Sequence, residues 1–308
     1  MTNSNVTLVE VGPRDGFQPI VPFIPTQEKI RLLQSLHAAG LRRIEATAFV
    51  SDRAVPQMAD ATEILAAASR LPGLDVQVLV PNVKYYERAV EAGARHVAFV
   101  ISVSEAHSRN NVRRSPDEAA AEYERLIETI DPGVALRLNV ATAFDCPFDG
   151  PVAAQTTLAL LDRLAPLRPD VEIALCDTTG RVTPDRVASL FDTAMARYGT
   201  GPSWVFHGHD TYGLGVANVL AAYAAGVRVF DASFGGLGGC PFAPGATGNV
   251  ATEDVVWTLE RMGIDTGIDL EPLLAAAAEA AVLPGANAGG RVRQALEGAR
   301  CAGVGLAG

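Results

Sequence analysis

Two histidines one residue apart stand out in the stretch VFHGHDTYG, residues 205–213. His207 and His209 follow an apolar, strand-like run in a chain that contains five histidines. Side chains at i and i+2 of an extended segment point to the same side, so both imidazoles can face one ion or one substrate. The spacing by itself fits two unrelated polar histidines equally well, and the rest of the chain must decide.

Oxygen ligands that could complete a site with these histidines occur in two other segments. Asp15 lies in GPRDG, directly after the first apolar run, and Asn249 closes the loop GGLGGCPFAPGATGN, residues 235–249. Two imidazoles, a carboxylate and an amide oxygen favour Mg²⁺ or Mn²⁺ over structural zinc, which would recruit thiolates. The alternative for Asp15 is an ordinary turn aspartate. The sequence thus predicts Asp15, His207, His209 and Asn249 as metal ligands.

The same loop carries a thiol, Cys240, which four glycines precede. Glycine-rich backbone is costly to order and free to move, so the loop is predicted to be a flap. A flap carrying one thiol over a metal site could close on substrate and exclude water. The alternative is a floppy connector with an incidental thiol.

Three further charged residues are candidates for catalytic roles: Arg14, Glu45 and Asp177. Arg14 beside Asp15 could form a surface ion pair, which would contribute little. At a site that holds a metal, its fixed guanidinium is better suited to stabilising an enolate oxygen. Glu45 is predicted to orient Arg14, and Asp177 to hold a metal-bound water or a histidine.

These residues must be positioned by alternating strands and helices. Short apolar, β-branched runs cover residues 6–11, 42–47, 75–80, 96–102, 134–140, 171–176, 203–208 and 227–233. Helix-like stretches cover 27–39, 57–69, 83–92, 116–130, 151–167, 183–198, 213–225 and 252–262. Eight strand–helix units in about 260 residues are typical of a (β/α)8 TIM barrel. A doubly wound sheet is the rival, but it would want a phosphate-binding glycine turn where GPRDG stands.

A TIM barrel would bring the candidates together, because its chemistry lies at the carboxyl ends of the strands. The polar residues expected at these ends are Arg14, Asp15, Glu45, Asn82, Asp177, His207, His209, Cys240 and Asn249. The sequence therefore predicts one rim on which they converge.

Helix boundaries carry their own signals. Ser115 and Thr183 each place a hydroxyl before a proline at the first helical position. Gly40, Gly93 and Gly226 stand where helices should stop. We expect two parts, a catalytic barrel over residues 1–265 and an Ala-rich helical extension over 266–308, packed against the barrel.

Composition narrows the class of protein. A net charge of −10 argues against nucleic-acid and anionic-membrane surfaces. The run LLAAAAEAAVL is too short to span a bilayer, and the first residues do not resemble a signal peptide. The four cysteines are widely scattered and form no CxxC pair, which suits free thiols in a reducing compartment. We expect an intracellular, cytoplasmic protein.

Several motifs, in order along the chain, resemble hydroxymethylglutaryl-CoA lyase, a family of DRE-type TIM-barrel metallolyases. The matching stretches are VEVGPRDGFQ (9–18), IEATAFVS (44–51), VPQM (55–58), PNVK (81–84), DTTG (177–180), HGHDTYG (207–213) and GLGGCPFAPGATGNVATED (236–254). They span nearly the entire predicted barrel, and the last is highly specific.

The resemblance implies a divalent metal held by Asp15, His207, His209 and Asn249. It also implies that Arg14 neutralises a thioester enolate and that Cys240 on the flap assists proton transfer. Glu45 and Gln18 fall on family positions near the site. The site residues predicted from residue types and spacing therefore agree with those that the resemblance implies.

The reaction that the resemblance implies is a retro-aldol-type (Claisen) cleavage of a 3-hydroxy-3-methylglutaryl-CoA-type thioester to acetyl-CoA and acetoacetate. The acyl-CoA thioester is the expected partner, and a homodimer is the expected assembly. Arg291 and Arg293 are possible partners for CoA phosphates, with a solvated helix as the alternative. Cys301 resembles a family thiol with a regulatory role.

Four positions depart from the family pattern. Gly208 stands where the family usually has Cys, and Ala48 where it has Ser. Ala141 removes a hydroxyl at the end of the fifth strand, and Asp145 replaces a glycine and adds a negative charge near an anionic acyl group. None of them is a predicted metal ligand, and they leave open a 3-hydroxyacyl-CoA with a different acyl branch.

Two other functions compete with the lyase. A condensing enzyme of the isopropylmalate or homocitrate synthase kind uses a similar metal barrel, but its first motif is normally DGEQ-like, whereas DGFQ (15–18) stands here. A catalytically silent barrel that binds CoA or a protein is the non-enzymatic rival. The presence of every predicted ligand together with Arg14 and Cys240 favours the enzyme.

Overall fold

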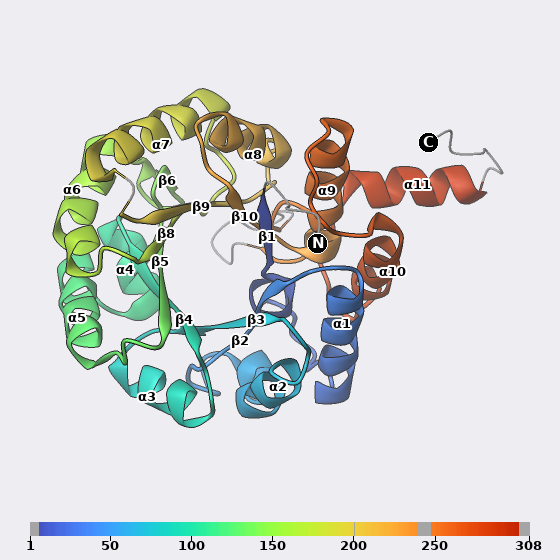
Figure 1. The fold of residues 1–308 in the computed structure, drawn as a ribbon, viewed down its shortest axis with the longest axis horizontal. Coiled ribbons are helices and arrows are strands. Elements are labelled where there is room, and N and C mark those ends of the chain that lie inside the picture. The colour runs from blue at the N-terminus through green and yellow to red at the C-terminus, as the bar shows by residue number, and fades with distance from the viewer. Residues whose placement is uncertain (1–5, 200, 240–247, 302–308) are drawn as a thin grey trace.

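The computed structural model describes residues 6–199, 201–239 and 248–301. Parallel strands form a closed barrel in the order β1-β10-β9-β8-β5-β4-β3-β2 (Figure 1). The barrel strands are β1 Thr7–Glu10, β2 Arg43–Ala48, β3 Asp75–Val80, β4 His96–Ser102, β5 Ala135–Ala141, β8 Glu172–Asp177, β9 Ser203–Gly208 and β10 Val229–Ala232. The predicted TIM barrel is confirmed, and closure rules out the open doubly wound sheet.

Helices surround the strands in Figure 1, as the alternation predicts. They are α1 Thr26–Ala38, α2 Ala61–Ala68, α3 Val83–Glu91, α4 Glu105–Val112, α5 Pro116–Thr129, α6 Ala154–Leu164, α7 Pro184–Tyr198, α8 Gly215–Ala224 and α9 Thr252–Arg261. The sequence pattern missed α4, because EAHSRNNV is polar and lacks an apolar stripe. It also missed the small hairpin of β6 Asp145–Cys146 and β7 Gly150–Pro151.

The predicted helix boundaries hold with one exception. Ser115 and Glu118 form a reciprocal capping box at the start of α5. Thr183 occupies the N-cap position of α7 but makes no side-chain capping hydrogen bond, so its predicted cap is wrong. Gly40 and Gly226 have φ of 105° and 107°, in the left-handed region that ends a helix at glycine.

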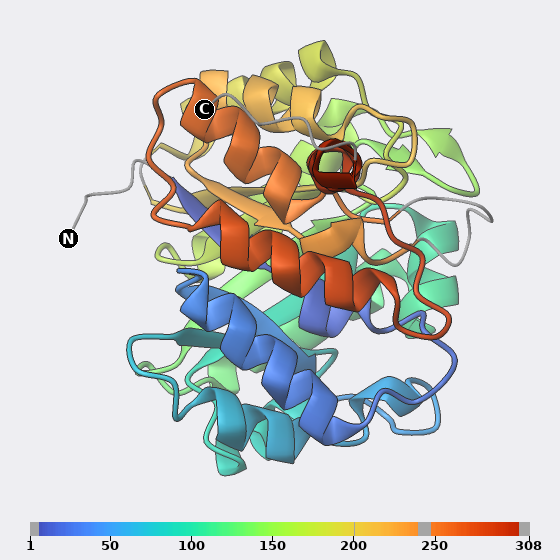
Figure 2. The same cartoon turned by 90° about the vertical axis from the view of Figure 1, so that its right-hand side faces the viewer.

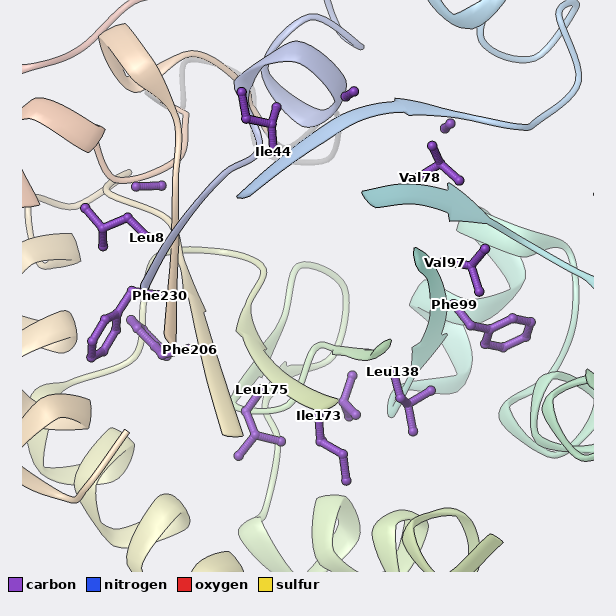
Figure 3. Close-up of a cluster of buried hydrophobic side chains, with 14 of the residues drawn as sticks. Leu8, Ile44, Val78, Val97, Phe99, Leu138, Ile173, Leu175, Phe206 and Phe230 are labelled. Atoms are coloured by element: carbon purple, nitrogen blue, oxygen red, sulfur yellow. The ribbon is translucent and has the colours of Figure 1, made fainter. Parts of the chain in front are cut away.

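The outward faces of the strands form the main hydrophobic core. Figure 3 shows these side chains pointing from the ring of strands toward the helices, among them Leu8, Val97, Leu138, Leu175 and Phe206. Each is at most 4% exposed. Because strand side chains alternate, the residues between them must point into the barrel.

The interior of the barrel is largely polar. Charged and amide side chains are buried there at Glu45, Gln77, Arg137 and Asp231. The small apolar side chains Ala174, Cys176 and Val205, with Val229, make a separate cluster inside the ring. This polar interior connects the strands to the site described below.

Two further helices form the C-terminal extension: α10 Leu270–Ala281 and α11 Arg291–Cys301. α10 lies beside α1 (Figure 2), where the Asp269 N–H donates to the Ala39 carbonyl at 2.8 Å. A Cβ on Gly40 would lie 2.5 Å from the Gly267 carbonyl oxygen, so glycine permits this approach. The predicted helical extension is confirmed. Within the residues covered by the structure, none of the helices has both the length and the apolarity to cross a bilayer.

Candidate active site

A π-helical turn, Gly12–Gly16, carries Arg14 and Asp15 at the end of β1. The Val11 carbonyl accepts from the N–H groups of Arg14 (3.1 Å) and Asp15 (2.7 Å), which closes the turn tightly. A Cβ on Gly12 would lie 2.5 Å from the ring of Phe234. The glycine therefore lets the turn lie directly against the segment that follows β10.

Glu10 fixes this turn to its neighbours. Its buried carboxylate accepts from the N–H groups of Gly12 (2.8 Å) and Phe234 (3.0 Å) and from the Thr252 hydroxyl (2.7 Å). Residues distant in the sequence thereby share one acceptor, which holds the turn at a defined place on the rim.

β9 positions both histidines, as the spacing predicts. His207 lies in the strand and His209 directly after it, with ring centroids 5.3 Å apart. His209 faces Asn249 in an isolated antiparallel bridge. The Val250 N–H donates to the Gly208 carbonyl at 3.0 Å, which fixes the segment around Asn249 against the end of β9. A Cβ on Gly208 would lie 2.6 Å from the Phe206 ring. This ring therefore fills the space that a side chain at position 208, such as the cysteine usual in the family, would occupy.

Asp15, His207 and His209 each offer a ligand atom, and these atoms lie within 4.8 Å of one another. Asn249 joins them because its Nδ2 donates to Asp15 Oδ2 at 2.8 Å and to the Leu237 carbonyl at 3.1 Å. The orientation leaves Asn249 Oδ1 buried without a partner, and His209 Nδ1 is likewise buried and unpaired among the described residues. Buried donor atoms of this kind fit a bound cation.

Charges around this cluster favour an anionic carboxylate and a neutral imidazole. Burial alone would raise the pKa of Asp15, but Arg14 and the two histidines outweigh it and hold that pKa well below its usual range. Burial, with His207 nearby, lowers the pKa of His209 to about 4. At neutral pH the cluster therefore offers the protonation states that a cation requires.

Arg14 lies between two carboxylates. Its Nε donates to Glu45 and its Nη1 to Asp15, while the side chain is 10% exposed. The second oxygen of Glu45 accepts from Gln77 Nε2 at 2.8 Å. This arrangement agrees with the predicted orientation of Arg14 by Glu45, and it leaves the guanidinium no freedom to rotate away.

Two buried residues beside the histidines, Asp231 and Arg137, were not predicted from the sequence. Asp231 Oδ2 lies 2.9 Å from His207 Nδ1, and Arg137 donates to the same oxygen. Burial alone would raise the pKa of Asp231, but Arg137 and His207 lower it to about 2. A signal was present: both charges interrupt apolar strands, VALRLNV and VRVFDAS, at positions that face the barrel interior.

Within the part of the chain that the structure describes, Asp177 contacts its own loop and neither histidine of the pair, and its predicted role toward a metal-bound water stays a prediction. Its fully buried carboxylate accepts from the Val182 N–H and the Thr179 hydroxyl, each at 3.4 Å, and thus organises its own loop. Burial raises the pKa of Asp177 to about 6. Among the described residues the carboxylate that contacts a histidine of the pair belongs to Asp231, one strand further along the barrel from β9.

Other predicted residues lie outside this cluster. Asn82 lies just after β3, where it caps α3 by accepting from the Tyr85 N–H at 3.1 Å, and any contribution of Asn82 to the site stays a prediction. Gln18 is exposed one turn after Arg14, whose carbonyl accepts its N–H at 3.1 Å. Cys240 lies outside the described residues, and so does the side chain of Cys301.

The two arginines predicted for CoA differ in their surroundings. Arg293 is 11% exposed and binds Glu297 (3.2 Å) and the Gly289 carbonyl (2.9 Å). Arg291 is exposed, and its N–H donates to Asp254 at 2.9 Å. Of the two, Arg291 has the guanidinium that is more open to a phosphate.

The segment after β5 contains the departures from the family pattern. The Asp145 carboxylate is 5% exposed, accepts from the Thr179 hydroxyl at 2.9 Å and pairs with Arg181 at 3.3 Å. The negative charge of Asp145 is therefore neutralised by Arg181, a partner that was not predicted from the sequence. Thr142 has φ of 55°, which is strained for a β-branched residue, and its N–H donates to the Thr178 hydroxyl at 2.8 Å. Ala48 and Ala141 are buried at the ends of their strands.

Comparison with known proteins agrees with the motifs. The HMGL-like family model matches residues 5–279. The mitochondrial hydroxymethylglutaryl-CoA lyase of Mus musculus is 42% identical over 272 residues, 88% of this chain and 83% of the mouse protein. The cytoplasmic 3-hydroxy-3-methylglutaryl-CoA lyase of Rattus norvegicus is 40% identical over 272 residues, 88% of this chain and 79% of the rat protein. The structure of an HMG-CoA lyase from Acenitobacter baumannii in complex with coenzyme A and 3-methylmalate has a TM-score of 0.88 and 36% identity and covers 96% of both chains. The expected resemblance is confirmed.

Proposed function

The chain belongs to the HMGL-like family, and from that premise we propose that it is a carbon–carbon lyase that cleaves 3-hydroxy-3-methylglutaryl-CoA to acetyl-CoA and acetoacetate with the help of Mg²⁺ or Mn²⁺. One observation carries the proposal beyond family membership. Ligand atoms of Asp15, His207 and His209 converge within 4.8 Å, beside Oδ1 of Asn249, which has no partner among the described residues. These four residues are the proposed metal ligands.

The chemistry divides between the ion and the side chains. A divalent ion, when bound, acts as a Lewis acid that makes the tertiary hydroxyl of the substrate easier to deprotonate. A base at the site, a histidine or a water, takes up the hydroxyl proton, and the C2–C3 bond breaks as the hydroxyl oxygen becomes a ketone carbonyl. The electron pair of that bond forms the C1=C2 double bond of an enolate whose negative charge lies on the thioester oxygen. The products are acetoacetate and the enolate of acetyl-CoA, which takes up one proton.

Arg14 is the proposed stabiliser of that enolate. Glu45 and Asp15 hold its guanidinium from two sides, so the positive charge is in place before the negative charge develops. Cys240 is the proposed acid that protonates the enolate carbon, and Gln18 is proposed to contact the substrate. Asp177, which organises its own loop, is proposed to hold a metal-bound water.

The acyl-CoA is proposed to enter over the same rim. The Acenitobacter baumannii relative was solved with coenzyme A, which supports a CoA thioester as the ligand class. Arg291 is the proposed partner for a CoA phosphate, since Arg293 is already bound to Glu297. The Asp145–Arg181 pair adds no net charge to the rim, which supports an anionic acyl group as substrate.

A cleavage assay tests this function. Purified protein is stripped with EDTA, reloaded with Mg²⁺ or Mn²⁺, and supplied with a panel of 3-hydroxy-3-alkylglutaryl-CoA thioesters. We expect metal-dependent release of acetyl-CoA, fastest with the methyl compound. If acetyl-CoA is released only from another thioester of the panel, that thioester is the substrate in place of the methyl compound. CoA release from acetyl-CoA and 2-oxo acids, without any cleavage, would replace the lyase with a condensing enzyme.

We also propose a homodimer in the cytoplasm. The resemblance supports the dimer, and light scattering of the eluted protein measures the mass directly. Cys146 and Cys176 are free and buried, which suits a reducing compartment. Relatives of both the cytoplasmic and the mitochondrial kind match this chain, so fractionation of the source cells is the deciding measurement.

A further inference from the structure

A buried carboxylate contacts Nδ1 of His207, one of the proposed metal ligands. Asp231 on β10 is 3% exposed, and its Oδ2 lies 2.9 Å from Nδ1 of His207 on the adjacent strand β9. The two residues are register partners in the parallel pair, so the contact follows from the strand pairing. An ionised carboxylate can only accept a hydrogen bond, and therefore Nδ1 of His207 must donate the proton.

Arg137 keeps the carboxylate in that state. It is fully buried, it donates to the same Oδ2 of Asp231, and its Nε donates to Asn139 Oδ1 at 2.7 Å. Glu172 lies 3.7 Å away on the next strand. A guanidinium cannot lose its charge in a protein, so the carboxylate beside it stays ionised.

We propose that Asp231, held by Arg137, is a positioning residue that fixes the tautomer and orientation of His207, with the proton on Nδ1 and the lone pair of Nε2 directed to the ion. The proposal rests on the metal-dependent function proposed above. A carboxylate behind a ligating imidazole orients the ring and makes it a stronger donor.

The site is thereby supported from two sides. On one side Asp15 is held by Arg14, which Glu45 orients. On the other side His207 is held by Asp231, which Arg137 orients. His209 has no such support at its buried Nδ1 among the described residues. Two ligands are thus fixed in advance, and the third keeps its free nitrogen for the ion.

The first test reads the proton in the wild-type protein and needs a substitution only to assign the signal. Nitrogen-15 NMR of the metal-free, full-length protein, with imidazole-labelled histidine, reports which nitrogen of His207 carries the proton. A variant that replaces His207 assigns the signal. We expect the proton on Nδ1. A proton on Nε2 in the wild-type protein would overturn the proposal even if the Asp231 variant described below failed to fold.

The second test measures metal affinity. D231N removes the charge but keeps the shape, and we expect Mn²⁺ affinity, read by electron paramagnetic resonance, to fall about 10- to 100-fold. The matched control is D60N, which neutralises a carboxylate paired with the buried Lys29 on the outside of the barrel. It should leave Mn²⁺ affinity unchanged.

The outcomes separate this proposal from the proposed function. If D231N binds Mn²⁺ within threefold of wild type and keeps the proton on Nδ1, Asp231 does not position His207. If the wild-type protein binds no Mn²⁺, the metal-dependent lyase fails, and the tautomer measurement still decides what Asp231 does to His207.

Discussion

Arg14 illustrates how a single residue is constrained before any substrate arrives. Its guanidinium is bound by Glu45 and Asp15, and Gln77 in turn holds Glu45. A planar fork with two fixed partners can present its remaining N–H groups in only one direction. The proposed role on the enolate therefore depends on the shape of the side chain as well as on its charge.

R14K tests that dependence. Lysine keeps a cation beside the buried Glu45, so folding should survive, but it loses the planar fork. We expect kcat to fall about 10²-fold, the usual cost of losing one charge-stabilising contact, with little change in KM. The control is R31K, an identical change at an exposed ion pair with Glu28 and Glu279. Equal kcat values for R14K and R31K would contradict the role of Arg14.

The Asp145–Arg181 pair gives a second prediction at this scale. R181A leaves the buried Asp145 carboxylate uncompensated at the rim, and an anionic acyl group should then bind about tenfold more weakly, read as an increase in KM. The double variant R181A/D145N removes both charges and should restore KM. A double variant as poor as R181A would mean that Arg181 itself contacts the substrate.

Three of the four predicted ligands could be found from the sequence because each lies where a strand ends. Asp15, His207 and His209 needed only the barrel and the i, i+2 rule. It was harder to predict which of Asp177 and Asp231 contacts a histidine. Both are buried aspartates of barrel strands, and the sequence does not reveal that strand pairing brings Asp231, and not Asp177, against His207.

Among the elements, the barrel strands could be predicted from the sequence, whereas α4 and the β6–β7 hairpin could not. Strand boundaries agree with the apolar runs within two residues, because burial on both faces of a parallel strand leaves an apolar signature. α4 and the β6–β7 hairpin carry polar residues and cover the rim. Their conformations depend on contacts such as that of Ser102 with His107, which no local pattern reveals.

The buried His107 of α4 leads to a prediction about how stability depends on pH. Burial lowers the pKa of His107 to about 4 from 6.5, so the unfolded chain binds the proton more tightly than the folded protein. Its contribution to stability is complete above pH 6.5 and is lost as the pH falls toward 4. H107N keeps an acceptor for Ser102 but cannot titrate.

We therefore expect the free energy of unfolding, measured by urea titration, to fall more steeply for wild type than for H107N between pH 6.5 and 4, by on the order of 2–3 kcal/mol. Parallel curves for the two proteins over this range would show that His107 is not buried in its neutral form.

For the whole molecule, we propose a division between residues 265 and 266 into a barrel and a helical extension. Hydrogen bonds nevertheless join the two parts closely. Asp254 on α9 accepts from the N–H groups of Arg291 (2.9 Å) and Val292 (2.7 Å), so it caps α11 from the barrel side. On the same surface the Gly289 N–H donates to the Gly235 carbonyl at 2.7 Å. The extension therefore supports the segment that leads to the predicted flap.

D254A tests this docking. Removing the carboxylate leaves two N–H groups without an acceptor, which should cost about 1–3 kcal/mol and open the chain between α10 and α11 to proteolysis. D269A, at the exposed N-cap of α10, is the matched control and should leave the protease sites protected. Equal protection of D254A and wild type would contradict the capping role.

The central claim is that four side chains from three segments of the barrel hold one divalent ion at its carboxyl-terminal mouth. Anomalous diffraction from crystals grown with Mn²⁺ tests it most directly. We expect one strong peak within bonding distance of Asp15, His207, His209 and Asn249 Oδ1. A map without a peak there, or with its only peak elsewhere on the molecule, would contradict it.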